Sequence, residues 1–303
     1  MDISIVIVNW NVRDFLERCL DSIFRNVGEL SFEVIVVDNC SRDGSVMMVE
    51  ERFPSVRIIR NANNAGFCRG NNQGIAISKG DYLLLLNPDT EIEERALEAL
   101  IDFASEHRDV GVVGPMLLYP KNYSMPNGSR FPTFWSEFLA KSGLADLLVG
   151  LLHMRNWYNL RYFGRQSFAG PAYVDFVSGA CMLIRREVIN QIGGLDERFF
   201  MFYDEVDFCL RARRAGWRVY YFPAARVFHN WHGVGRSVSQ SQDAAKQRFF
   251  LSQYAYFEKH HGVLAALVLR ALGILSLSRA RYLLDAPRYI LSASLAIVRS
   301  LRR

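Results

Sequence analysis

Short apolar runs alternate with helical patterns along residues 1–118. The apolar runs lie at residues 3–8, 32–37, 56–59, 82–86 and 110–115. Between them, segments such as 13–26 and 93–106 place apolar residues at helical spacing. Buried strands that alternate with amphipathic helices are typical of an α/β fold. We therefore predict a mostly parallel, Rossmann-like sheet covered by helices.

Polar clusters follow three of these predicted strands. They read "NWN" at 9–11, "DNCSRDGS" at 38–45 and "NPDTE" at 87–91. In open α/β sheets, ligands bind beyond the carboxyl ends of the strands. The pattern therefore predicts a binding site at that edge of the sheet.

The second half of the chain is less regular. An aromatic-rich insertion at about 133–165 has helical periodicity, and it reads either as a buried helical pair or as a lid for an acceptor. Core character returns at 173–188. We predict one domain over 1–261, followed by a separate tail over 262–303.

Composition favours a globular protein in a reducing compartment. Half of the residues are hydrophobic, which suffices for a sizeable core. The five cysteines are odd in number and form no CxxC pair, which argues against a disulfide framework or a thiolate zinc site. The first ten residues have no basic region before their short apolar run, so they indicate a strand rather than a signal peptide. We expect a cytoplasmic protein.

The positive charge is concentrated in the tail. Residues 262–303 contain seven arginines and one aspartate, a balance of +6, whereas the whole chain is +5. The main domain therefore gives no support for a nucleic-acid partner. The apolar runs of the tail are too short to span a bilayer. The tail either packs on its own domain or, as we favour, lies on the inner face of the cell membrane with its arginines at the headgroups.

Two carboxylate positions suggest chemistry but have simpler explanations when taken alone. Asp38 begins a stretch that suits a tight turn. Asp89 follows a four-leucine strand, where it is either a helix cap or a ligand for a hard cation that also binds phosphate oxygens.

The glycine-rich stretch 63–74 allows close backbone approach to a ligand. It lacks a Walker lysine and does not match GxGxxG.

Seven motifs in the same order give the chain a family resemblance. They are "VIVNWN", "VVDNCSRDGS", "NNAGFCRGNNQGI", "LLLLNPDTEI", "SGACMLIRREVINQIGGLDERFF", "FYDEVDFCLRARRAGWRVYYFP" and "VFHNWHGVGRS". Over residues 3 to about 240, the chain resembles family 2 inverting glycosyltransferases with the GT-A fold, especially their rhamnosyltransferase-like branch. The resemblance implies a sugar-nucleotide donor, Mg²⁺ or Mn²⁺, and direct displacement at the anomeric carbon.

The resemblance also implies roles for individual residues at the strand ends. Asp38 matches the residue that hydrogen-bonds the nucleotide base, with Asn9 and Asn11 as its neighbours. "NPD" stands where the family has its DxD motif. Asp89 is then the metal ligand, and Asn87 replaces the first acid and contacts ribose.

Further residues are assigned to the donor from the same resemblance. Arg69 and Asn72 match a loop that passes the donor phosphates and sugar, and Arg236 matches a segment that contacts the diphosphate. His229 matches a histidine that approaches the metal or its phosphates, but His232 is close enough to exchange roles with it.

Three acids in "DEVD" either open a helix or include the catalytic base. Negative side chains are favoured in a first helical turn. In the resemblance, however, Glu205 matches the general base, and Asp204 is the reserve candidate. The aromatic run at 199–203 provides apolar surface that raises a carboxyl pKa into a useful range. We expect Asp207 to brace the helix or pair with Arg211.

We therefore predict a metal-dependent glycosyltransferase. The branch resembled implies transfer of L-rhamnose from dTDP-rhamnose to a lipid-linked or polysaccharide acceptor in cell-surface glycan synthesis. UDP-galactofuranose, a UDP-hexose or another dTDP-sugar are alternative donors. A catalytically silent, sugar-nucleotide-binding scaffold is the rival of a different class. A nucleotidyltransferase is disfavoured, because no glycine-rich loop with a basic residue follows the first strand.

Overall fold

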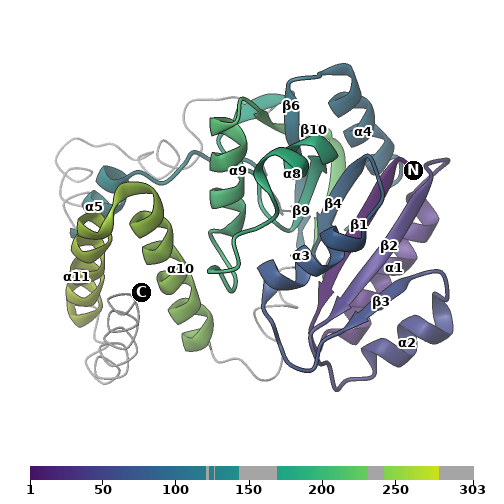
Figure 1. Cartoon of the computed structure of the whole chain (residues 1–303), viewed down its shortest axis with the longest axis horizontal. Coiled ribbons are helices and arrows are strands. Elements are labelled where there is room, and N and C mark those ends of the chain that lie inside the picture. The colour runs from purple at the N-terminus through teal and green to yellow at the C-terminus, as the bar shows by residue number, and fades with distance from the viewer. Residues whose placement is uncertain (121–122, 126, 143–168, 231–241, 280–303) are drawn as a thin grey trace.

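The computed structural model describes residues 1–120, 123–125, 127–142, 169–230 and 242–279. Their centre is one large sheet with helices packed on its faces, and a group of helices lies to one side of it (Figure 1). The strands are β1 (Ile3–Asn9), β2 (Phe32–Asp38), β3 (Arg57–Arg60), β4 (Tyr82–Leu86), β5 (Thr90–Ile92), β6 (Val110–Tyr119), β7 (Tyr123–Met125), β8 (Ala172–Val174), β9 (Cys181–Arg185) and β10 (Arg218–His229). All five strands expected from the apolar runs are present.

The two faces of the sheet are covered by different helices. These are α1 (Arg13–Asn26), α2 (Ser45–Arg52) and α4 (Ala96–Glu106) on one face, and α3 (Phe67–Ile77), α8 (Arg186–Ile192) and α9 (Asp204–Arg214) on the other. Within β1, Ile5 and Ile7 are buried in the first core and Val6 in the second. Successive side chains of a strand point to opposite faces, so a strand covered on both faces reads as a continuous apolar run.

The sheet is mixed, with a majority of strands in one direction. Its order is β3-β2-β1-β4-β9-β6-β10-β5, and the first four strands are parallel neighbours. Strand β9 is antiparallel to both β4 and β6, between which it lies. An antiparallel strand begins where its neighbours end, so the start of β9 lies at their carboxyl edge. The expected α/β sheet covered by helices is confirmed: β1, β2, β3, β4, β6 and β10 run in one direction, and β5, β7, β8 and β9 run opposite to them.

Three helices form the group beside the sheet. They are α5 (Phe134–Ser142), α10 (Gln242–His261) and α11 (Val263–Arg279). Helix α11 packs against α5 and α10 (Figure 1). Gly262, whose φ of +90° favours glycine, separates α10 from α11. This turn coincides with the boundary predicted at 261–262, although the division into domain and tail stays a prediction.

No helix within the described ranges is long and apolar enough to cross a membrane. Of the aromatic insertion expected at about 133–165, the structure describes α5 and the residues next to it, and positions 143–165 lie outside the described residues. The tail is described as far as Arg279.

Candidate active site

The ends of β1 and β2 bring Asn9 and Asp38 together. The two residues are register partners in parallel strands, and both are buried. Asn9 Nδ2 donates to Asp38 Oδ1 at 2.8 Å, and the backbone N–H of Ser41 donates to Asp38 Oδ2 at 2.9 Å. Both carboxylate oxygens of Asp38 are therefore hydrogen-bonded, which fixes the orientation of this side chain at the edge of the sheet.

Asn11 shapes the turn that follows β2. Its φ of 53° is left-handed, a conformation that asparagine adopts more readily than most residues. Its backbone N–H donates to Ser41 Oγ at 2.9 Å, and its Oδ1 accepts from the N–H of Arg42 at 2.7 Å. Asn11 is thus hydrogen-bonded to Ser41 and Arg42 of the loop that begins at Asp38.

Antiparallel pairing of β5 with β10 brings Asp89 to His229. Thr90 and His229 are register partners, and the backbone N–H of Asn230 donates to the carbonyl of Asp89 at 2.8 Å. Asp89 Oδ1 lies 3.4 Å from His229 Nε2. The Asp89 side chain is almost fully buried, and its Oδ1 has no hydrogen-bond partner among the described residues.

A buried carboxylate oxygen without a hydrogen-bond partner fits a hard cation. The described residues contain no group of three or more His, Cys, Asp or Glu side chains that could enclose a metal. Mg²⁺ in nucleotide enzymes is commonly held by one or two protein ligands together with substrate phosphates. Asp89 and His229 therefore fit a divalent cation that is completed by a phosphorylated ligand rather than by a cage of protein side chains.

Asp204 and Glu205 begin α9, directly after a strained turn. Phe202 and Tyr203 both have left-handed φ values, 68° and 62°, which are uncommon for aromatic residues. Burial raises the pKa of Asp204 to about 6. Burial, followed by the charge of Asp204, raises the pKa of Glu205 well above its usual value. The expected aromatic surface is present: Phe199 and Tyr203 are buried in the same core as Val206.

The third acid of the motif has a different role. Asp207 is fully buried; Arg211 Nε donates to its Oδ2 at 2.8 Å, and Lys259 Nζ and His260 Nε2 lie 2.5 and 2.7 Å from its Oδ1. Burial opposes its ionisation, but these hydrogen bonds outweigh burial and lower its pKa. The expected pairing of Asp207 with Arg211 is confirmed, and Asp207 also joins α9 to α10.

One cavity of about 300 Å³ brings together the predicted catalytic and metal-binding residues. Five of the predicted site residues line it: Asn87, Asp89, Asp204, Glu205 and His229. Other lining residues were not predicted, among them Phe67, Tyr119, Met201 and the segment 178–180. The motif "SGA" before β9 was visible in the sequence. Its place beside Asn87, whose N–H donates to the carbonyl of Ala180 at 2.9 Å, depends on the antiparallel pairing.

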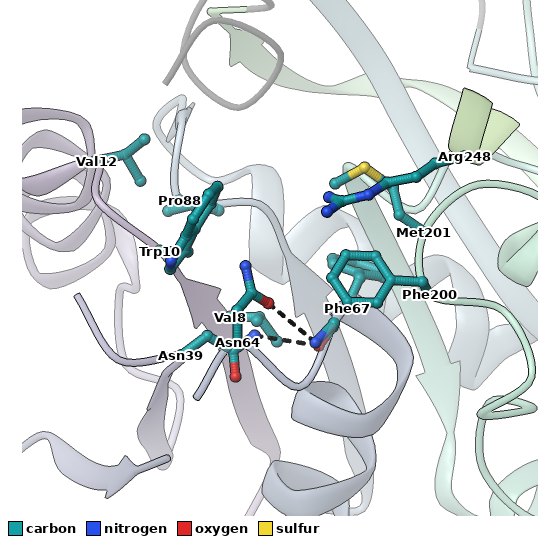
Figure 2. Close-up of a pocket in the computed structure, with 11 residues that line it drawn as sticks. Val8, Trp10, Val12, Asn39, Asn64, Phe67, Pro88, Phe200, Met201 and Arg248 are labelled. Atoms are coloured by element: carbon teal, nitrogen blue, oxygen red, sulfur yellow. Dashed lines mark hydrogen bonds between the residues drawn. The ribbon is translucent and has the colours of Figure 1, made fainter. Parts of the chain in front are cut away.

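A smaller cavity of about 50 Å³ adjoins the first, because Val8, Phe67, Pro88 and Met201 line both. Figure 2 shows Trp10 and Pro88 on one side of it and Phe200, Met201 and Arg248 on the other. Asn39, the neighbour of Asp38, lies at its base and donates to the carbonyl of Gly66 at 3.1 Å. The two cavities together connect the ends of β1 and β2 with the acids of α9.

Two predicted donor residues, Arg69 and Asn72, belong to α3 and line neither of these cavities. Arg69 is exposed. Asn72 Nδ2 donates to the carbonyl of Leu195 at 2.8 Å, and Asn72 Oδ1 accepts from the Leu195 N–H at 2.9 Å, so its amide joins α3 to the loop after α8. Arg236 lies outside the described residues, as does His232, and the choice between His229 and His232 therefore stays open.

Comparison with known sequences finds a family profile and relatives that are named rhamnosyltransferases. The family profile "Glycosyl transferase family 2" matches residues 4–193. The chain is 30% identical over 271 residues to N-acetylglucosaminyl-diphospho-decaprenol L-rhamnosyltransferase of Mycobacterium tuberculosis, covering 86% of this chain and 85% of the relative. It is 25% identical over 246 residues to the rhamnosyltransferase WbbL of Escherichia coli K12, with 78% and 86% coverage.

Comparison with solved structures shows the same fold. GalNAc-T7 with UDP, GalNAc and Mn²⁺ superposes with a TM-score of 0.58 at 17% identity, covering 86% of this chain and 51% of that protein. The mannosyltransferase PcManGT of Pyrobaculum calidifontis with GDP-Man and Mn²⁺ gives 0.55 at 15% identity, with 97% and 80% coverage. These neighbours show a GT-A fold, and the family match identifies the class as a glycosyltransferase. With a family profile over more than half of its length, the chain belongs to glycosyl transferase family 2.

Proposed function

We propose that this enzyme transfers L-rhamnose, with inversion, from dTDP-rhamnose to a lipid-linked or polysaccharide acceptor in cell-surface glycan synthesis. The observation that carries the proposal is the cavity in which Glu205, with its raised pKa, lines the same space as Asp89 and His229. The donor and acceptor classes are supported by the names of the rhamnosyltransferase relatives.

Glu205 is the proposed general base. In a direct displacement, the acceptor hydroxyl loses its proton as it attacks the anomeric carbon, and a carboxylate with a raised pKa accepts that proton effectively near neutral pH. Burial and the neighbouring Asp204 supply the shift. Asp204 remains the reserve base, because it lines the same cavity and titrates with it.

The donor is proposed to extend from the end of β2 to the acids of α9. Asp38, oriented by Asn9, would bind the base, and Asn87 the ribose. Asp89 and His229 would hold Mg²⁺ or Mn²⁺, which when bound neutralises charge on the nucleoside diphosphate leaving group. Arg69, Asn72 and Arg236 stay predicted donor contacts, and the structure gives Asn72 a packing role in addition.

The C-terminal region is proposed to place the enzyme on the inner face of the cell membrane. Helix α11 presents Leu264, Leu267 and Leu275 to solvent, with Leu264 77% exposed. The spacing puts these leucines on one side of the helix. A lipid surface would bury this stripe, while the arginine-rich tail contacts anionic headgroups.

Release of nucleoside diphosphate tests the activity. The full-length enzyme would be incubated with dTDP-rhamnose, UDP-galactofuranose or UDP-hexoses, Mg²⁺ or Mn²⁺, and a membrane-lipid acceptor. We expect selective release from dTDP-rhamnose. Glu205→Gln should slow it by about 10²- to 10⁴-fold with donor affinity retained, whereas the exposed Glu187→Gln should not.

Other results would revise the proposal in different ways. Release from a UDP-sugar would keep the mechanism and change the donor. Donor binding without turnover in every acceptor mixture would support the silent scaffold. Unchanged release by Glu205→Gln would remove Glu205 as the base.

A further inference from the structure

The smaller cavity contains a basic residue that the family resemblance did not suggest. Among the described residues that line the two adjoining cavities, Arg248 is the one that carries a guanidinium or ammonium group. It comes from α10, beyond the last motif that carries the resemblance, which ends at Ser237. The cavities are otherwise rich in acids, with Asp89, Asp204 and Glu205 in the larger one.

Neighbouring residues hold the Arg248 guanidinium in place. Its guanidinium carbon lies 4.2 Å from the centroid of the Phe200 ring, a cation–π contact. Phe200 is itself held against the start of α3, because its carbonyl accepts from the N–H of Phe67 at 2.8 Å. A Cβ at Gly66 would lie 2.8 Å from the Phe200 ring, so the glycine allows this close approach. A stacked guanidinium keeps its N–H groups in a fixed plane.

The geometry points to a diphosphate as the ligand of Arg248. A donor whose base lies near Asp38 and Asn39 and whose sugar lies near Glu205 would pass residues that line both cavities, Pro88 and Met201 among them. Figure 2 shows the Arg248 side chain beside Met201 and across from Pro88. Burial lowers the pKa of Arg248, and a bound anion would favour its charged form.

We propose that Arg248 binds a phosphate oxygen of the donor nucleoside diphosphate and is thus a specificity-determining residue for diphosphate-linked donors. This inference rests on the proposed function. The Arg248 guanidinium, supplied by α10, would bind the diphosphate together with the metal ion that Asp89 would hold. Planar bidentate contact to phosphate oxygens is the interaction that arginine makes better than lysine.

Calorimetric titration without acceptor tests the inference. The probes are dTDP and UDP, the corresponding monophosphates, and the nucleosides thymidine and uridine. Arg248→Gln should weaken binding of the preferred diphosphate by about 10- to 100-fold and leave the affinity for its nucleoside unchanged. Arg248→Lys should recover part of the loss. Lys246→Gln removes an exposed charge from the same helix and should have no effect on binding.

The outcomes separate this inference from the proposed function. If the wild-type enzyme binds none of these nucleotides, the proposed function fails. If it binds the diphosphate and Arg248→Gln binds it equally well, the inference alone is wrong. An equal loss for nucleoside and diphosphate would show a structural role instead. A raised KM for a diphosphate-linked lipid acceptor with unchanged diphosphate affinity would assign Arg248 to the acceptor and overturn the donor contact.

Discussion

Asp204 and Glu205 act as a coupled pair of acids. They are adjacent at the start of α9 and line the same cavity. After burial, the charge of Asp204 is the largest cause of the raised pKa of Glu205. Two carboxyl groups that interact this strongly lose their protons in two steps that belong to the pair. The raised pKa that would suit Glu205 to its proposed role therefore depends partly on the neighbouring Asp204.

The pH dependence of kcat/KM for the acceptor should show this coupling. A general base is active when ionised, and both pKa values are raised, that of Asp204 to about 6. We therefore expect activity to rise with pH through a limb at or above pH 6 rather than near the ordinary value of Glu. Asp204→Asn should move the limb to lower pH, because it removes the repulsion that raises the Glu205 pKa.

This variant also decides between the two candidate bases. Loss of turnover in Asp204→Asn, with Glu205→Gln active, would identify Asp204 as the base. A limb near pH 4 to 5 that stays in place in Asp204→Asn would contradict the coupling.

Helix α10 acts as a brace for the turn that carries the acids. Ser252 Oγ donates to the carbonyl of Met201 at 2.7 Å, and Gln253 Nε2 donates to the hydroxyl of Tyr203 at 2.7 Å. At its far end, Lys259 and His260 bind Asp207 of α9. Consecutive left-handed residues persist only where their surroundings hold them. The contacts from α10 therefore stabilise the strained turn at 202–203 from both sides.

Removing the central carboxylate of this brace should destabilise the fold. Asp207→Asn leaves Arg211, Lys259 and His260 around a neutral amide, and breaking a buried ion pair typically costs about 3–5 kcal/mol. We expect a loss of this size in the free energy of unfolding at pH 7, measured by urea denaturation. The exposed pair of Asp109 with Arg218 provides the control, since Asp109→Asn should change stability by less than about 1 kcal/mol.

The effect should also depend on pH with a defined sign. The pKa of Asp207 is lowered in the folded protein, so its contribution is present above the unfolded pKa of about 4 and is lost as pH falls through the folded value. The stability difference between wild type and Asp207→Asn should therefore shrink in acid. A difference that is constant down to pH 3 would show that the carboxylate charge is not its cause.

The molecule has two ends with different surfaces. The N-terminal part of the sheet and its helices lie at one end, and α5, α10 and α11 form the other (Figure 1). Exposed large apolar side chains concentrate at the second end, where Trp135, Phe249 and Leu264 belong to the three helices. Contiguous exposed apolar surface commonly marks an interaction site. The larger cavity is lined from both ends, by Asn87 and Asp89 near the sheet and by Ala245 of α10.

Vesicle sedimentation tests whether a membrane binds this exposed apolar surface. The double variant Leu264→Ser/Leu267→Ser should bind vesicles containing phosphatidylserine several-fold more weakly than wild type, because less apolar area enters the interface. Met47→Ser, which changes an exposed residue on α2, should bind as wild type does. Wild-type protein that remains in the supernatant with these vesicles would reject membrane association through α11.

Local pattern was enough to predict the strand that ends at Asp38, the strand that precedes Asp89, the helix at 13–26 and the turn chemistry at 38–45. These features depend on neighbours along the chain: apolar runs for buried strands, helical spacing for α1, and short polar residues for turns. The pairing of Asp207 with Arg211 could also be predicted from the sequence, because the two residues are four positions apart on one helix.

Other features required contacts between distant segments. The antiparallel insertion of β9, which brings 178–180 beside Asn87, has no signal in the period of its own residues. The use of Asn72 in packing depends on the loop at Leu195, and the cavity position of Arg248 depends on the docking of α10. An apolar run predicts that a strand is buried, but not which strand pairs with it or in which direction it runs. Strand order and the residues that line the cavities therefore follow from the packing of the whole chain.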